Sequence, residues 1–403
     1  MTAIGDFGRG ALYGPWRAVL VLGVTQILTW GCIYYTPVLI VPLIAAERGW
    51  SIAFAMGGLS AGFLTAGLVL PAVGRMIDRF GGHVVMAAGS LAGALGLALI
   101  VIVTNPIGYF GVWMLLGVAM AANLYDAAFA TLGRIFGAAA RRPITALTLA
   151  GGFASTVSWP TTYALLERSD WHATYLIYAA VLAFVAAPLH AFVLPRSRAA
   201  FDTRPAGDAG EAKPAPVLPP RGMAFLLVAT GFTVYAFVPS GLAAHLLAIF
   251  DRSGIDAATV VWIGALYGPA QVGARIIEFA IVRDMHPLWI MRFALAVLLA
   301  AFAGLAALGI VPVIAAVFMM MFGAANGLVT ISRGAVPLAL FGATGYGHLL
   351  GRLAGPYLLM QAAAPLVMAI VVERASDPAA LALAAGFAAL ALVCFVVIRR
   401  PSS

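Results

Sequence analysis

The chain has 403 residues, of which 63% are hydrophobic and only 9% are charged. Soluble globular domains carry about 25% charged residues, so this composition excludes them, together with disordered chains and nucleic-acid-binding proteins. The two cysteines also exclude a disulfide-rich scaffold. A helix that spans a bilayer needs about 20 apolar residues, and the chain is long enough for about twelve of them. The sequence therefore predicts an all-α integral membrane protein whose surroundings are the lipid bilayer.

Apolar segments recur along the whole chain and are separated by short polar connections. Their lengths are those of membrane-spanning helices, and we predict twelve of them. The predicted spans are residues 17–43, 52–73, 84–104, 108–136, 144–166, 172–194, 223–249, 257–282, 286–308, 312–340, 346–372 and 379–398.

Basic residues are distributed unevenly between the two sets of loops. One side contains four, whereas the other side, which includes both termini, contains sixteen. Because cytoplasmic loops are enriched in Lys and Arg, the basic side is predicted to be cytoplasmic. We therefore expect a multi-pass protein of the cell inner (plasma) membrane with both termini in the cytoplasm. The four basic residues of the opposite side are Arg48, Arg168, Arg252 and Arg374.

Residues 195–221 interrupt the apolar pattern with a run rich in proline, alanine and charge. This composition predicts a flexible cytoplasmic linker between an N-terminal six-helix bundle, residues 1–194, and a C-terminal one, residues 222–403. The halves also resemble each other at a shift of about 205 residues, since the Phe-Gly-Ala sequence at 136–138 returns at 341–343. Two pseudo-symmetric bundles are predicted.

The connection between the second and third spans reads Gly-Arg-Met-Ile-Asp-Arg-Phe-Gly at residues 74–81. It is similar to the cytoplasmic loop signature of the major facilitator superfamily, although Gly82 and His83 stand where the family usually has basic residues. The resemblance implies the major facilitator fold, in which two six-helix repeats bind a substrate near the membrane midplane. It also implies that Asp78 and Arg79 take part in gating. Solvated charges in a tight turn at a helix end are the alternative interpretation.

Three arginines are predicted to lie inside the spans: Arg275, Arg333 and Arg352. A charged side chain at the centre of a membrane helix costs roughly 2.5–3.5 kcal/mol, and such residues mark functional sites. Asp126 and Glu278 are the comparably placed acids. Even if each acid neutralises one arginine, one positive charge is in excess. This excess predicts an anionic small-molecule substrate.

Helical spacing places several polar residues on common faces. Tyr267, Gln271, Arg275 and Glu278 follow one another at intervals of four, four and three residues, so they form one stripe on the eighth span. Such a stripe must face protein or water rather than lipid.

Two further spans carry similar groups. Asn326 and Arg333 share a face of the tenth span, and Tyr34 lies on a more aromatic face of the first. In the superfamily arrangement these faces line one central path, so the resemblance implies that Tyr34, Tyr267, Gln271 and Asn326 contact the substrate. Packing of Tyr34 against neighbouring helices is the alternative.

Within the superfamily, an arginine on the eighth span and a basic residue on the eleventh resemble the oxalate/formate antiporter and monocarboxylate porter branch. In that branch the two positive groups bind substrate carboxylates, and the matching residues here are Arg275 and Arg352. A planar guanidinium holds a carboxylate through two hydrogen bonds. The alternative is that Glu278 neutralises Arg275 and that Arg352 extends to the cytoplasmic surface.

Asp126 is the predicted proton carrier, because a carboxyl group in apolar surroundings holds a proton more readily than one in water. A static ion pair with Arg333 or Arg134 is the alternative. Glu278 is a second candidate for proton coupling, and also a structural partner of Arg275.

We therefore predict a secondary active transporter that moves a small organic anion, a mono- or dicarboxylate, by alternating access with proton coupling or exchange for a counter-anion. Proton-driven efflux of a drug or toxic compound is the alternative. An intramembrane enzyme and a non-transporting receptor are weaker interpretations. We find no phosphate-binding loop and no zinc spacing, so neither a cofactor nor a metal is predicted, and a monomer is expected.

Overall fold

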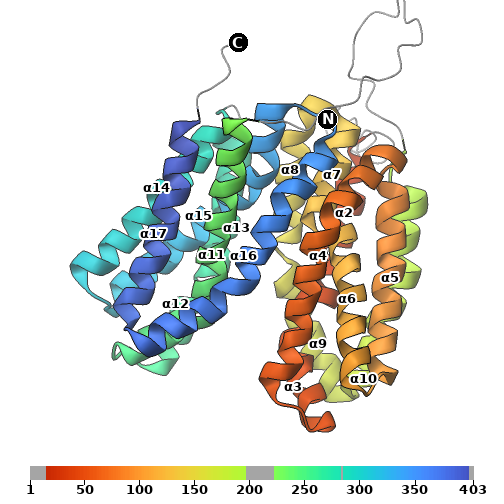
Figure 1. The fold of residues 1–403 in the computed structure, drawn as a ribbon, viewed down its shortest axis with the longest axis horizontal. Coiled ribbons are helices and arrows are strands. Elements are labelled where there is room, and N and C mark those ends of the chain that lie inside the picture. The colour runs from red at the N-terminus through yellow and green to blue at the C-terminus, as the bar shows by residue number, and fades with distance from the viewer. Residues whose placement is uncertain (1–14, 197–221, 283–284, 399–403) are drawn as a thin grey trace, which may run out of the picture. The chain divides into compact units, whose positions relative to one another are not determined.

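The computed structural model describes residues 15–196, 222–282 and 285–398 (Figure 1). Every regular element in these ranges is a helix, as predicted. Most of the predicted linker at 195–221 lies outside the described residues. The chain divides into two compact units, here called unit 1, Met1–Pro220 with Phe341–Gly355, and unit 2, Arg221–Leu340 with Pro356–Ser403.

Unit 1 contains all the described helices before residue 220. Their ends follow local chemistry: Ser51 accepts a hydrogen bond from Phe54 N at 3.1 Å to begin α4, and Asn105 accepts one from Gly108 N at 2.7 Å to begin α6. The helices are α2 (Arg17–Thr29), η1 (Trp30–Tyr35), α3 (Pro37–Arg48), α4 (Ile52–Phe80), α5 (Gly82–Ile102), α6 (Pro106–Asn123), α7 (Tyr125–Phe136), η2 (Gly137–Ala140), α8 (Arg141–Gly151), α9 (Ala154–Arg168), α10 (Trp171–Val181), η3 (Leu182–Ala186) and η4 (Leu189–Val193).

Glycines allow the helices of unit 1 to approach closely. A Cβ atom on Gly117 of α6 would lie 2.2 Å from the carbonyl oxygen of Gly62 in α4, so only glycine fits there. Figure 1 shows α4 and α6 side by side. The glycine pattern of these spans is therefore a packing device.

Unit 2 is built from longer helices. They are α11 (Met223–Arg252), α12 (Ala257–Ala265), α13 (Tyr267–Ile277), η5 (Glu278–Val282), α14 (Pro287–Leu308), α15 (Pro312–Phe341), α16 (Tyr346–Arg374) and α17 (Asp377–Val397). Helix α16 begins in unit 1 and continues into unit 2 after Gly355. Pro365 inside α16 leaves the carbonyl of Gln361 without its helical donor, and Ser240 Oγ supplies a hydrogen bond to it at 2.6 Å.

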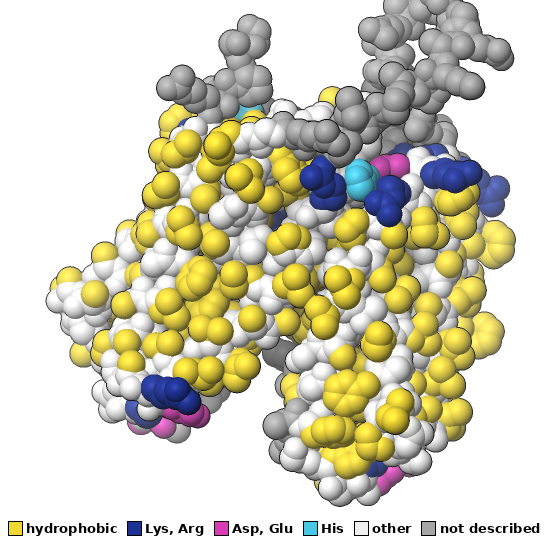
Figure 2. All heavy atoms as spheres, in the orientation of Figure 1, with side chains coloured by type: hydrophobic (Ala, Val, Ile, Leu, Met, Phe, Trp, Pro, Cys, Tyr) yellow, Lys and Arg dark blue, Asp and Glu magenta, His cyan; other side chains and the backbone are white. Residues whose placement is uncertain are grey.

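On the face that Figure 2 shows, hydrophobic side chains cover the helices and charged side chains lie near the helix ends. Large apolar side chains such as Leu68, Trp262 and Ile281 are 69%, 75% and 75% exposed. Ten segments of the described residues are long and apolar enough to cross a membrane. The other two predicted spans, 144–166 and 257–282, coincide with α8–α9 and with α12, α13 and η5, where shorter helices follow one another.

Several spans differ in detail from the prediction. The segment 74–81 is not a tight turn: α4 stays helical to Phe80, and the turn is confined to Gly81, whose φ is 90°. The first span widens into the π-helix η1 before α3, where Thr36 N bonds Gly31 O at 3.2 Å. Pro37 lacks an N–H and cannot continue the regular α-helical ladder at that point.

Candidate functional site

The predicted stripe of the eighth span lies in unit 2 on α13 and η5. Arg275 in the last turn of α13 is only 3% exposed, and Glu278 at the start of η5 is 1% exposed. The predicted continuous helix is interrupted here. Pro269 in the first turn of α13 cannot donate a hydrogen bond to α12, and a π-helical turn begins at Glu278. Irregular helix of this kind is frequent at functional sites.

Helix α15 packs directly against this stripe. Cβ atoms on Gly323 and Gly327 would lie 2.4 and 2.5 Å from the carbonyl oxygens of Tyr267 and Gln271, so glycine at both positions brings the two backbones together. Asn326 lies between these glycines and accepts a hydrogen bond from Tyr235 Oη at 2.9 Å. The structure thus brings α11, α13 and α15 together around Tyr267, Gln271 and Asn326.

Arg333 lies two turns further along α15. Its guanidinium carbon is 4.0 Å from the ring centroid of Tyr357 in α16, which is the geometry of a cation–π contact. Arg275 and Arg333 therefore both belong to unit 2. Arg352 is half-buried in the part of α16 that belongs to unit 1, so one unit does not hold all three arginines.

Tyr34 belongs to an aromatic cluster in unit 1, which we define as Trp30, Tyr34, Tyr35 and Tyr125. The ring centroid of Trp30 lies 4.6, 6.0 and 5.1 Å from those of Tyr34, Tyr35 and Tyr125. All four rings are half-buried. Trp30, Tyr34 and Tyr35 all belong to η1. The wider turn of this π-helix brings their rings close together.

Asp126 directly follows this cluster in the first turn of α7 and is half-buried. The predicted fourth span is not continuous: α6 ends at Asn123, and Leu124, with a ψ of −171°, separates it from α7. Asp126 therefore lies at a helix N-terminus, where backbone N–H groups and the helix dipole stabilise negative charge.

Asp78 and Arg79 have different surroundings. The carboxylate of Asp78 accepts hydrogen bonds from Gly347 N at 3.1 Å and His348 N at 2.9 Å, so it caps the first turn of α16. Arg134 donates to the main-chain carbonyl of Asp78. Arg79 is exposed, with its guanidinium carbon 5.0 Å from the ring centroid of Phe80. The start of α16 was not expected as the partner of this loop.

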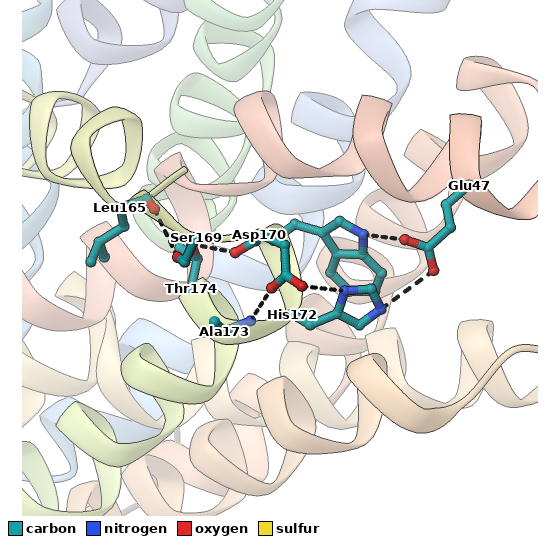
Figure 3. Close-up of polar contacts among 8 residues, drawn as sticks. Glu47, Leu165, Ser169, Asp170, His172, Ala173 and Thr174 are labelled. Carbon is teal, nitrogen blue, oxygen red and sulfur yellow. Dashed lines mark hydrogen bonds and ion pairs between the residues drawn. The ribbon is translucent and has the colours of Figure 1, made fainter. Parts of the chain in front are cut away.

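Sequence reasoning also missed a charged cluster at the opposite end of unit 1. His172 Nε2 lies 3.3 Å from Glu47 Oε1, and its Nδ1 lies 3.6 Å from Asp170 Oδ2 (Figure 3). Trp171 Nε1 donates to Glu47 Oε2 at 2.7 Å, and Arg48 lies over the Trp171 ring at 5.5 Å. These contacts join the end of α3 to the start of α10.

A buried polar layer in unit 1 was missed as well. Thr25, Gln26, Ser90, Asn123 and His190 are each 0% exposed, although they come from four different helices. The signal was present, because each is a polar residue within an apolar segment. Sequence alone did not indicate that the five meet.

The comparisons with known proteins agree with this architecture. The family model of the Major Facilitator Superfamily matches residues 19–351, so the chain belongs to this superfamily. It is therefore a multi-pass membrane protein and a secondary active transporter, since the superfamily consists of transporters rather than enzymes.

Solved structures show the same fold. The human organic anion transporter MFSD10 (TETRAN) superimposes with a TM-score of 0.72 at 17% identity, covering 94% of this chain and 99% of that chain. The E. coli fucose:proton symporter FucP gives a TM-score of 0.70 at 14% identity, covering 94% of this chain and 97% of that chain. The proton:xylose symporter XylE gives 0.66 at 11% identity, covering 94% of each. Comparison with curated proteins gives no match.

Proposed function

We propose that this transporter carries a small organic anion, a mono- or dicarboxylate. The observation that carries the proposal is the charge of the spans in unit 2. The polar stripe of α13 and η5 and the polar face of α15 hold two arginines, Arg275 and Arg333, and one acid, Glu278, and Arg275 is 3% exposed. Arg275 and Glu278 are both buried, so the positive excess is carried by the half-buried Arg333, and such an excess in a low-dielectric environment favours binding of an anion.

The surrounding groups suit a carboxylate. Guanidinium groups bind carboxylates through paired hydrogen bonds, and hydroxyl and amide groups can complete the shell. The substrate contacts that we propose are Arg275, Arg333, Tyr267, Gln271 and Asn326 of unit 2, and Tyr34 and Arg352 of unit 1. Because Arg275 is buried, access of the substrate requires movement of the protein, which alternating access provides.

Proton coupling or anion exchange would drive the transport. We propose Asp126 as the proton carrier and Glu278 as a second group for proton coupling. Asp78, which caps α16, and the exposed Arg79 are proposed for gating. Among the similar folds, MFSD10 is an organic anion transporter, while FucP and XylE are proton symporters. The proposed relationship to the oxalate/formate antiporter and monocarboxylate porter branch rests on Arg275 and Arg352.

We further propose a monomer in the plasma membrane with both termini in the cytoplasm. This topology rests on the sixteen basic residues on one side against four on the other.

Proton-driven efflux of a drug or toxic compound is a second candidate function. The aromatic cluster of Trp30, Tyr34, Tyr35 and Tyr125 favours it, because aromatic faces attract organic cations and Asp126 follows the cluster directly. Resistance of an expression strain to several hydrophobic cations, lost in Asp126→Asn, would support efflux over carboxylate transport.

The test is uptake of radiolabelled formate, lactate and oxalate into proteoliposomes. We expect saturable uptake of at least one of them, and its loss in Arg275→Gln while the protein stays folded in detergent. Arg252→Gln is the matched control, because Arg252 is exposed at a helix end and bonds Asp377 at 2.6 Å. Normal uptake by Arg275→Gln, or no uptake of any of the three by the wild type, would overturn the proposal.

A further inference from the structure

The buried polar layer of unit 1 is a continuous hydrogen-bonded chain. Ser90 Oγ donates to Asn123 Oδ1 at 3.0 Å and lies 3.1 Å from His190 Nδ1. A hydroxyl group has one hydrogen, so Ser90 must accept its second bond from an N–H at Nδ1 of His190. Asn123 Nδ2 donates to Ala119 O at 3.1 Å, which fixes the orientation of the amide.

The other side of the imidazole is also bonded. His190 Nε2 lies 2.9 Å from Thr25 Oγ1, whose longer contact is 3.3 Å to Leu22 O. With Nδ1 protonated, a neutral imidazole can only accept at Nε2, so the single Thr25 hydrogen is shared between Nε2 at 2.9 Å and Leu22 O at 3.3 Å. The neutral form is the one that burial favours, because an ionised group at 0% exposure would be costly. The layer is therefore neutral.

This chain ends at the break in the fourth span. In a continuous α-helix the carbonyl of Asn123 would accept the N–H of Ala127. Here it accepts Gln26 Nε2 at 2.5 Å instead, and Gln26 Oε1 accepts Trp30 Nε1 at 2.9 Å. Helical bonding resumes with Ala128 N to Leu124 O at 3.1 Å. The side chain of Gln26 thus donates a hydrogen bond to the carbonyl of Asn123, which the break leaves without its helical donor.

We infer that Gln26 and His190 are positioning residues for proton coupling. Together with Ser90 and Asn123 they hold the fourth span broken at Leu124, and the break places Asp126 in the first turn of α7. The same chain orients Trp30, whose ring packs against Tyr125, the residue before Asp126. This inference rests on the proposed function of Asp126 as proton carrier.

The first test needs no substrate and follows backbone amide hydrogen exchange of residues 120–128 in purified full-length protein. Gln26→Met keeps the volume of the side chain but removes both polar atoms. Because Gln26 occupies Asn123 O, its removal should allow the N–H of Ala127 to bond that carbonyl, so we expect exchange at Ala127 to fall about tenfold, which corresponds to ~1.4 kcal/mol. Thr29→Val is the matched control, because Thr29 is buried in α2 and bonds only its own helix, at Thr25 O. Unchanged or faster exchange at Ala127 in Gln26→Met would overturn the inference.

The second test separates positioning from general stability. Proteoliposomes are assayed with formate, lactate and oxalate for accumulation driven by a proton gradient and for counterflow exchange. In Gln26→Met and His190→Leu we expect accumulation to fall about tenfold relative to counterflow. His190→Asn, which keeps a donor for Ser90, should restore the ratio. Equal losses of both activities would indicate a merely structural role and would contradict the inference.

The variant Asp126→Asn separates the proposed coupling role of Asp126 from the proposed positioning role of Gln26. If Asp126→Asn accumulates substrate normally, the proposed coupling role of Asp126 is wrong. If Asp126→Asn fails to accumulate while Gln26→Met matches the wild type, the positioning role alone is wrong. If the wild type transports none of the three anions, the proposed function is wrong. The amide exchange of residues 120–128 then tests by itself whether Gln26 holds the break at Leu124.

Discussion

The buried polar groups of the two units differ in charge. In unit 1 the layer of Thr25, Gln26, Ser90, Asn123 and His190 is neutral and bonded largely to itself. In unit 2 the most buried polar groups of α13 and η5 are charged, with Arg275 at 3% and Glu278 at 1% exposure. A neutral network fixes the shape of the helices, whereas buried charge offers binding energy to an ion. Substitutions in the neutral layer of unit 1 should therefore alter stability and coupling, and those in the charged stripe of unit 2 should alter substrate affinity.

The largest expected effect is that of Arg275→Lys. Lysine keeps the positive charge but loses the planar pair of donors, so we expect KM for the transported anion to rise about a hundredfold, or ~2.7 kcal/mol. Proteoliposome kinetics would measure it. An unchanged KM with a lowered melting temperature would instead assign Arg275 to stability and remove the contrast between the units.

Asp78→Ala should have the next largest effect. It removes the acceptor of the Gly347 and His348 N–H groups, and hydrogen bonds to a charged group contribute about 2 kcal/mol. We expect faster amide exchange at the start of α16. Asp170→Ala is the control, since Asp170 caps α10 by accepting from Ala173 N at 2.7 Å. Equal protection of α16 in both variants would argue against Asp78 as its cap.

Ser90→Ala tests the neutral layer. It leaves His190 and Asn123 each without one buried partner, which costs about 1.5 kcal/mol. The melting temperature in detergent should fall, while KM for the substrate stays unchanged. A raised KM without loss of stability would show that the layer acts on substrate binding and that the comparison is wrong.

The smallest effect is expected for Tyr235→Phe. The change removes the donor to Asn326 Oδ1 but keeps the ring, so the loss in stability should be about 1 kcal/mol. Because Asn326 is a proposed substrate contact, we also expect a small rise in KM. Thermal melting and uptake kinetics together would measure both, and a change in melting temperature alone would exclude Asn326 from the substrate site.

The helical membrane fold could be predicted from the sequence, because hydrophobic spans, charge bias and the segment at 74–81 are local features. The breaks within spans could be predicted only in part. Pro37 and Pro269 indicate interruptions by their missing N–H groups. Leu124 carries no such signal, because the break there depends on Gln26, a residue 98 positions earlier in the chain.

The candidate site shows the same limit. Intramembrane charges identified Arg275 and Glu278 as unusual, and both are buried. The helix that Asp78 caps could not be predicted, since Gly347 at the start of α16 lies 269 residues away in the chain. Contacts between distant residues depend on packing that spacing along one helix does not encode.

The central claim is that the positive excess of Arg275 and Arg333 over Glu278 selects an anion, and the most direct measurement is thermal stabilisation of the purified protein by matched ligands. Lactate and oxalate are compared with lactamide and oxamide, which have similar shapes and no charge. We expect that at least one anion raises the melting temperature of the wild type and not of Arg275→Gln, while neither amide does. Equal stabilisation by an amide and its anion, or retention of the effect in Arg275→Gln, would contradict it.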